Sequence, residues 1–174
     1  MPLTLDQIFI PACERRITST YGVLEKVRAY AKANGISEGE LLATRFIEDM
    51  WALPNQVQGI WAHSAYAIEQ VKTGEYHPNP NDVPTTWEEM YKMLEKARDG
   101  LPAVDDGELE KIAGETVYFV FGKPLFKFTV QNFLLSFSMP NVHFHATTAY
   151  DLLRMKGSDI GKFDFLGNLP TESI

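Results

Sequence analysis

Apolar residues recur at intervals of three and four along two long stretches of the sequence, and this spacing constrains the fold more than any other feature. The first stretch carries Ile10, Cys13, Ile17, Thr20, Leu24, Val27 and Ala31. The second carries Leu42, Phe46, Met50, Leu53, Val57, Ile60, Ser64, Ala67 and Val71. An α-helix brings positions three and four apart onto one face, so each stretch predicts a long helix with one buried face. Such helices must pack against other elements to bury those faces.

Local start and stop signals bound these helices. Asn34-Gly35 ends the first, and Ser37 with Glu40 has the capping-box spacing that begins the second. The second helix contains Pro54, which cannot donate a hydrogen bond to the carbonyl of Met50. We expect a bend or a loosened turn at Pro54, and not two separate helices.

Two further helices and a hairpin complete the expected elements. Thr85 and Thr86 are each followed by a glutamate three positions on, which predicts the start of a third helix that ends at Asp99-Gly100. Residues 116–130 are β-branched and aromatic on both sides of Gly122-Lys123, a pattern typical of a hairpin. A fourth helix follows, from about Gln131 to Lys156, and is interrupted by Pro140.

The predicted fold class is therefore all-α: one four-helix-bundle domain over residues 1–174 with a small β-hairpin, at about 116–130, inserted before the last helix. Residues 157–174 contain Phe163, Phe165 and Leu166 and are too apolar for a solvated tail. We expect them to form a C-terminal arm that packs back onto the bundle.

Charge and cysteine content narrow the partners. The net charge of −7 repels phosphate backbones and anionic lipid, so neither nucleic acid nor a membrane surface is an expected partner. No apolar run approaches the ~20 residues of a spanning helix, and no secretion signal is evident. The single Cys13 excludes an intramolecular disulfide and fits a reducing compartment, which favours the cytoplasm.

Polar residues stand where the second and fourth helices would normally be apolar, and they are the main functional clue. On the second helix they fall beside the apolar stripe and comprise Arg45, Asp49, Gln56 and His63. On the fourth they share the inward arc and comprise Ser138, Asn141, His145 and Thr148. Two readings stay open: a paired structural network, or a polar cleft between the two helices that binds a small molecule. The ligand-binding candidates are Arg45, Asp49, Gln56, Asn141 and His145.

Metal binding is not expected. Asp49 and His63 are fourteen residues apart, which is about 21 Å along a helix, so they cannot share one ion. The weak metal candidates are His63, His145 and Asp49, and together they supply few strong ligands. His145 itself could act as a general base, a metal ligand or a hydrogen-bond donor. We therefore expect no cofactor, with a divalent metal as the less favoured alternative.

Several segments resemble a known family. The most distinctive are 140–150 (PNVHFHATTAY), 152–154 (LLR) and 160–167 (IGKFDFLG), with weaker likeness at 46–50 (FIEDM) and 54–57. The sequence resembles domain-of-unknown-function family nineteen-ninety-three, a branch of the DinB-like, YfiT-like four-helix-bundle superfamily. This resemblance implies an up-down-down-up bundle and, commonly, a homodimer, but no known reaction.

The resemblance also bears on metal chemistry. Better-characterised members of the superfamily hold a divalent metal with three histidines, one from the second helix and a pair four apart on the fourth, for thiol transfer or hydrolysis. Here the positions four before and four after His145 are Asn141 and Ala149. The histidine pair is broken, which leaves metal-dependent transfer or hydrolysis as an alternative function.

A second set of apolar residues on the second helix bears on self-association. Trp51, Trp61, Tyr66 and Ile68 project away from the principal stripe. The hairpin, the C-terminal arm or another subunit could cover them, and with the family habit we expect a homodimer. For function we place a small-molecule-binding protein or an undiscovered enzyme first, and a structural or interaction module second.

Overall fold

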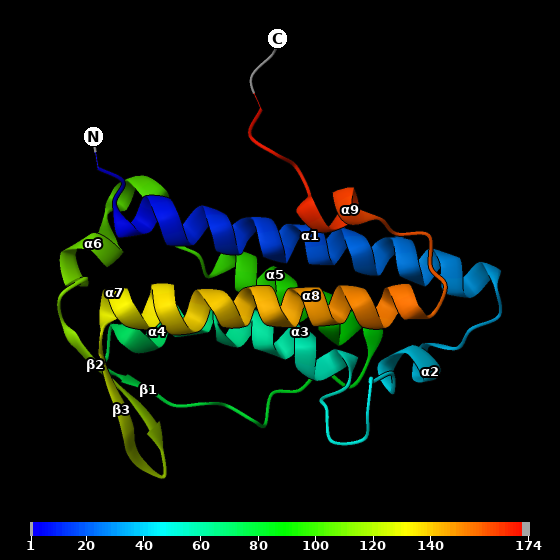
Figure 1. The fold of residues 1–174 in the computed structure, drawn as a ribbon, viewed down its shortest axis with the longest axis horizontal. Coiled ribbons are helices and arrows are strands. Elements are labelled where there is room, and N and C mark those ends of the chain that lie inside the picture. Colours follow the sequence, from blue (N-terminus) through cyan, green and yellow to red (C-terminus); the bar gives the residue numbers. More distant parts are fainter. Residues whose placement is uncertain (1, 172–174) are drawn as a thin grey trace.

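The fold, in a computed structural model that describes residues 2–171, is built on four long helical units. They are α1 (Leu5–Ala33), the pair α3 (Leu53–Ala62) and α4 (Ala65–Val71), α5 (Trp87–Asp99), and α8 (Met139–Met155). Helix α1 packs on α8 and α5, and α3 packs on the same two helices, which closes the bundle. Figure 1 shows α1 and α8 running one way and α3 and α5 the other, so the bundle is up-down-down-up.

Shorter elements connect these units. They are α2 (Glu38–Leu42), the 3₁₀ turn η1 (Val104–Asp106), α6 (Glu108–Ile112), α7 (Val130–Asn132), the π-helical segment η2 (Phe133–Ser138) and α9 (Lys162–Leu166). The π-helical turns lie just before Pro140, whose missing N–H breaks the regular pattern of the fourth helix.

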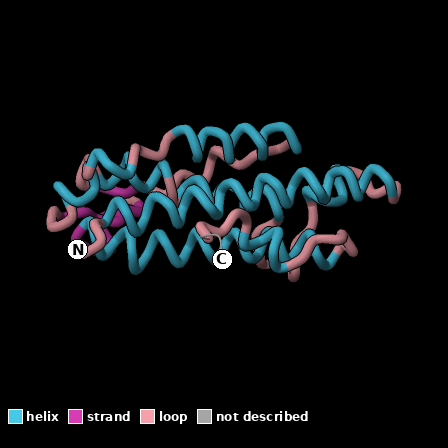
Figure 2. The backbone as a smooth tube through the Cα atoms, turned by 90° about the horizontal axis from the view of Figure 1, so that it is seen from above, coloured by secondary structure: helices cyan, strands magenta, loops and turns pink. Residues whose placement is uncertain are grey.

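A small sheet stands at one end of the bundle. The predicted hairpin consists of β2 (Thr116–Phe121) and β3 (Lys123–Thr129), joined at Gly122 with a φ of 71°. A third strand, β1 (Glu75–Tyr76), pairs parallel to β2 and was not predicted from the sequence. Figure 2 shows the strands gathered at the end where α1 begins.

The core lies between the four helical units, where the stripe residues of α1 and α3 are buried. Cys13 is buried in it, and burial raises the pKa of its thiol. The fully buried Trp87 and Leu94 of α5 complete the interior. The caps expected at Ser37 and Thr86 are both formed, accepting from the backbone N–H of Glu40 and Glu89.

The expectation of one bent second helix is wrong. The chain leaves α2 at Ala43, forms a loop over residues 43–52 and begins α3 at Leu53, so Pro54 stands in the first turn of a new helix. A proline costs nothing there, because first-turn N–H groups have no intrahelical partner. The backbone N–H of Leu53 donates to Thr44 O at 3.1 Å and closes the loop.

The C-terminal segment docks on α1 through Arg16. The Arg16 guanidinium is 4% exposed, donates to Leu166 O at 2.9 Å and to Phe165 O, and lies over the Phe165 ring. Phe163, also expected to pack inward, is instead 81% exposed. Residues 172–174 of the predicted arm lie outside the described residues.

One buried carboxylate links the start of α1 to α6. Asp6 of α1 is fully buried, and its two oxygens accept from the backbone N–H groups of Leu109 at 3.0 Å and Glu110 at 2.8 Å. In return, the Glu110 carboxylate accepts from Leu5 N at 2.7 Å. Asp6 thus caps α6, which offers no such cap from its own N-terminal residue.

Within residues 2–171, no helix has the length and apolarity needed to cross a membrane.

Candidate functional site

His145 of α8 lies against α3 and is 5% exposed. Its Nδ1 atom is 2.8 Å from Oε1 of the buried Gln56. Gln56 in turn donates from Nε2 to the backbone carbonyl of Trp51 at 3.0 Å. The Trp51 carbonyl can only accept, so the amide nitrogen of Gln56 must face it and the amide oxygen must face His145.

This orientation determines the tautomer of His145. An amide oxygen only accepts, so the hydrogen is on Nδ1 and Nε2 carries a lone pair. Within the described residues, no group donates a hydrogen bond to Nε2 of His145. Nε2 of His145 is therefore a hydrogen-bond acceptor that no described residue uses.

Gly59 lets His145 approach α3 this closely. A Cβ atom at position 59 would lie 2.4 Å from Cδ2, 2.5 Å from Cγ and 2.7 Å from Nε2 of the His145 ring. Gln56, Gly59 and His63 follow one another at intervals of three and four, so they share one face of α3. The His145 imidazole lies over Gly59, between the side chains of Gln56 and His63. We call Gln56, Gly59, His63 and His145 the histidine site.

His63 is the second imidazole of the site. It ends α3, and its ring stacks on that of His145 with centroids 5.9 Å apart and planes 13° apart. Its Nδ1 atom is buried and has no hydrogen-bond partner among residues 2–171, which costs about 1–3 kcal/mol unless a water or a ligand pairs with it. Ser138 Oγ, on the π-helical segment, is another buried atom without a partner.

Both imidazoles are neutral at physiological pH. Desolvation by burial lowers the pKa of His145 from 6.5 to about 4. Desolvation, and secondarily the charge of His145, lowers the pKa of His63 to about 3. His143 is exposed on α8, and its pKa is lowered first by desolvation and then by the charge of Arg16.

Aromatic rings extend the stack on both sides. Trp51 lies on His145 with centroids 5.9 Å apart, and Tyr76 lies on His63 at 5.8 Å. Trp51 is 57% exposed, whereas Tyr76 is buried.

The five predicted ligand-binding residues do not come together. Gln56 and His145 meet, as described. Arg45 and Asp49 lie in the exposed loop 43–52, because the second helix is broken there, so the expected cleft containing both is wrong. Asn141 is half-buried and donates to Phe137 O at 2.7 Å, where it serves the π-helical backbone. Sequence reasoning missed Gly59, although a glycine between Gln56 and His63 on the polar stripe was the signal for a close approach.

Comparison with known proteins agrees with this architecture. Residues 5–166 match the family described as Domain of unknown function (DUF1993). The chain belongs to the DUF1993 family. A crystal structure of a DinB family member protein from Shewanella denitrificans is similar to it, with a TM-score of 0.77 and 26% identity over 98% of this chain and 96% of that one. Among curated proteins, none matches the chain.

The residues of this DUF1993 protein do not fit the three-histidine metal centre of the wider superfamily. Within residues 2–171, no group of three or more His, Cys, Asp or Glu side chains is placed to hold one ion. His63 and His145 lie face to face, so their ring nitrogens do not converge, and Asp49 is exposed on its loop. We derive no step through a metal, and the expectation of no metal stays a prediction.

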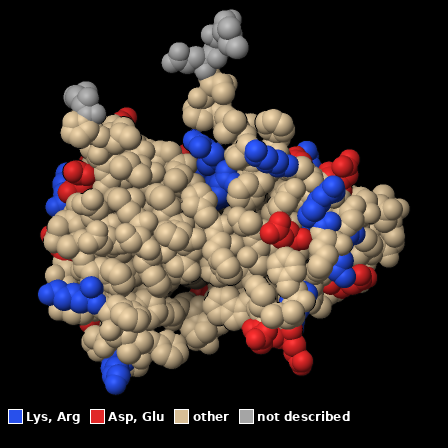
Figure 3. All heavy atoms as spheres, viewed as in Figure 1, with Lys and Arg blue, Asp and Glu red and all other residues tan. Residues whose placement is uncertain are grey.

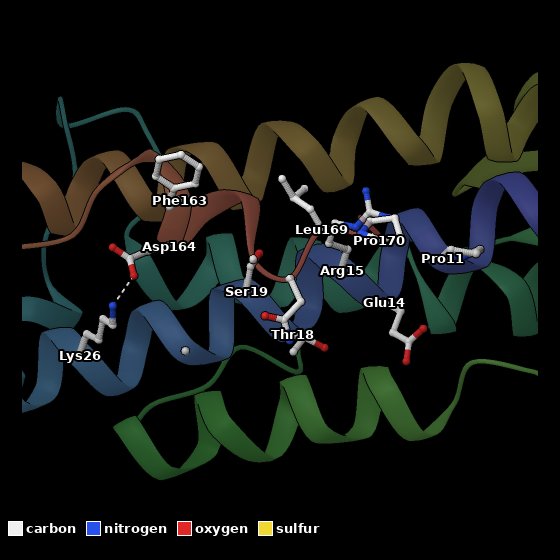
Figure 4. Close-up of a pocket in the computed structure, with 13 residues that line it drawn as sticks. Pro11, Glu14, Arg15, Thr18, Ser19, Lys26, Phe163, Asp164, Leu169 and Pro170 are labelled. Carbon is white, nitrogen blue, oxygen red and sulfur yellow. Dashed lines mark hydrogen bonds and ion pairs between the residues drawn. The ribbon is translucent and has the colours of Figure 1, made fainter. Parts of the chain in front are cut away.

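A second hollow of this DUF1993 protein lies between α1 and the C-terminal segment. It has a volume of about 660 Å³ and is drawn in Figure 4. Its floor is the α1 residues Thr18, Ser19 and Gly22, and its walls include Phe163 and residues 167–170. The sequence analysis missed this hollow, because its floor and walls are about 150 positions apart in the chain and no local pattern joins them.

Proposed function

We propose that this DUF1993 protein binds a small, uncharged molecule at the histidine site, where Nε2 of His145 accepts a hydrogen bond from it. The observation that carries the proposal is the buried Nδ1 of His63, which lacks a partner beside a His145 whose tautomer Gln56 determines. Buried polar atoms without partners are rare in folded proteins. A ligand that pairs with the two imidazoles accounts for both features.

The lowered pKa values favour binding over proton transfer. A general base works best with a pKa near the operating pH, whereas the pKa of His145 is about 4. At neutral pH the His145 imidazole is a weak base, but its Nε2 lone pair is free to accept a hydrogen bond. We therefore place binding first and leave no catalytic role with His145.

The same lowered pKa values favour an uncharged ligand. Neither imidazole carries a positive charge at neutral pH, so the site offers no attraction to an anion. The rings of Trp51 and Tyr76 at the two ends of the stack make the surroundings aromatic, which suits a flat apolar molecule. The chemistry that fits is a hydroxyl or N–H donor on an aromatic or apolar molecule.

Phenol and anisole form a matched pair of probes, because only phenol can donate a hydrogen bond. We expect ¹⁵N NMR of the labelled histidines to show Nδ1–H and a bare Nε2 at His145 in the free protein. Phenol should shift the Nε2 resonance, and anisole should not. The variant Gln56→Leu should weaken the phenol response, because the tautomer is no longer held.

His77, an exposed histidine on the segment after β1, serves as the internal control, since its resonances should respond equally to both probes. Protonation of Nε2 in the free protein, or equal responses to phenol and anisole, would refute the proposal. Stoichiometric zinc, nickel or iron in untagged protein, lost in His145→Ala, would instead support the metal-dependent transfer or hydrolysis known in the superfamily. A paired network that excludes every probe would favour a structural module.

We also propose a homodimer. Of the four apolar residues that project away from the principal stripe of the second helix, three are covered within the chain. Trp61 and Ile68 are buried, and Tyr66 packs on Trp61 and Tyr76. Part of the cover comes from Lys96 of α5, whose Nζ lies 4.3 Å from the centre of the Trp61 ring. Trp51 stays exposed, as do Phe46, Ile47 and Phe144, and these apolar side chains support self-association.

A further inference from the structure

The hollow between α1 and the C-terminal segment is large enough for a small molecule. Its volume of about 660 Å³ lies within the range of about 300–1,000 Å³ typical of ligand pockets. Gly22 contributes to the space, because a Cβ built on it would meet nothing within 4 Å. None of the residues of the histidine site lines this hollow, so the two sites are separate.

One charged pair at the hollow is satisfied internally. Lys26 of α1 forms an ion pair with Asp164 of α9, as the dashed line in Figure 4 shows. Asp164 also accepts from the backbone N–H of Gly161 at 2.7 Å. The bond to Lys26, and then that to Gly161, lowers the pKa of Asp164. This carboxylate and this ammonium therefore leave no net charge for a ligand.

Arg15 is different, because it brings an uncompensated positive charge. It is half-buried, and no carboxylate within the described residues pairs with it. In Figure 4 it reaches toward Leu169 and Pro170, whereas Glu14 points away and is exposed. The neighbouring Arg16 donates only to carbonyl oxygens, so its charge is not neutralised either.

The electrostatic consequence is a local positive region on a chain of net charge −7. The pKa of Arg16 is lowered, first by desolvation and then by the charge of Arg15, as expected of two guanidinium groups without a carboxylate. Figure 3 shows Lys and Arg side chains around α9 on this face, with Asp and Glu side chains among them. A guanidinium that lines a concave site binds carboxylate or phosphate groups well.

Two exposed apolar side chains also line the hollow. Leu169, which is 44% exposed, lies beside Arg15, and Phe163, which is 81% exposed, lies at the other end beside Asp164. An aromatic ring this exposed at the edge of a cavity offers a stacking surface that nothing in the described chain uses. An apolar body against Phe163 and an anionic group at Arg15 would fill the hollow from end to end.

From this arrangement we infer that the hollow between α1 and α9 is a binding site for a small organic anion. Arg15 holds its carboxylate or phosphate group, and Phe163 packs on its apolar body. The site differs in place and in charge from the uncharged-ligand site at His145. Its occupancy does not depend on the function proposed there.

The test compares three probes that share one ring: phenylacetate, phenyl phosphate and the uncharged phenylacetamide. Each is titrated into ¹⁵N-labelled protein, and backbone shifts at Thr18, Gly22 and Phe163 report the hollow. We expect both anions, or one of them, to bind there and phenylacetamide not to bind. The relative affinities of the two anions distinguish a carboxylate ligand from a phosphate ligand.

Two matched pairs of variants complete the test. Arg15→Gln should weaken anion binding about tenfold or more, as expected for loss of a charged hydrogen bond. Arg98→Gln, which makes the same change of net charge at an exposed position of α5, should leave anion binding unchanged. Phe163→Ser should weaken binding of the anions, and Phe121→Ser, at another exposed ring on β2, should not.

Three results would overturn the inference. The first is no shift at the hollow with either anion at about 10 mM, a concentration that detects even millimolar affinity. The second is equal binding of phenylacetamide. The third is an equal effect of Arg15→Gln and Arg98→Gln, which would assign the attraction to net charge alone.

Discussion

Replacing Gly59 by alanine tests the central contact of the histidine site. In most helices this change stabilises by about 1 kcal/mol, because glycine is the poorer helix former. Here the new Cβ would lie 2.4 Å from Cδ2 of the buried His145 ring. An ordinary contact begins at about 3.4 Å, so the ring must move by about 1 Å. His145 cannot do so and keep its 2.8 Å bond to Gln56.

The opposing effects can be compared in magnitude. Overpacking of a core costs about 1–3 kcal/mol, and a buried amide oxygen left without a donor costs about 1–3 kcal/mol more. Taking about 2 kcal/mol for each and subtracting the helix gain of about 1 leaves a net loss of about 3 kcal/mol. For a chain of this length that loss lowers Tm by about 6–12 °C.

Gly22→Ala is the matched control, since it is the same change within α1 at a position where the Cβ meets nothing within 4 Å. It should raise Tm by about 2–4 °C through helix propensity alone. Thermal unfolding followed by circular dichroism measures both variants, and urea unfolding gives the free energies. A Gly59→Ala protein as stable as Gly22→Ala would refute the close approach of α3 to His145.

The remaining predictions concern charge, capping and assembly. Gln56→Glu should raise the pKa of His145 above about 4, because a carboxylate favours the imidazolium, and NMR titration measures the shift. The His145 pKa is below its unfolded value of 6.5, so the unfolded chain binds more protons and stability should fall as pH drops from about 6.5 toward 4. His145→Gln should reduce that slope in urea unfolding, and His77→Gln should not. Asp6→Ala should cost about 1–3 kcal/mol and speed amide exchange at Leu109, whereas the exposed Asp105→Ala should be neutral. Light scattering should give about twice the 19.7 kDa chain mass, and Trp51→Ser should shift it toward the monomer.

Local pattern was sufficient for much of the fold. The stripe from Ile10 to Ala31 is buried along α1, because the periodicity of an apolar face is a property of the helix itself. The caps at Ser37 and Thr86 and the turn at Gly122 follow the same logic, since their donors and acceptors lie within a few residues of one another. Family membership, too, could be read from the segments around His145.

Only the tertiary structure decided where the second helix breaks and which polar residues meet. If the helix continued through Pro54, Arg45 and Asp49 would lie on the same face as Gln56. Instead α3 begins at Leu53, where a proline in the first turn is tolerated, and Arg45 and Asp49 lie on the preceding loop. The pairing of Gln56 with His145 spans 89 positions, and the hollow beside Arg15 joins residues still farther apart in the chain. A sequence specifies which residues can pair, but how closely two helices approach is decided by packing, and here that packing depends on the missing side chain of Gly59.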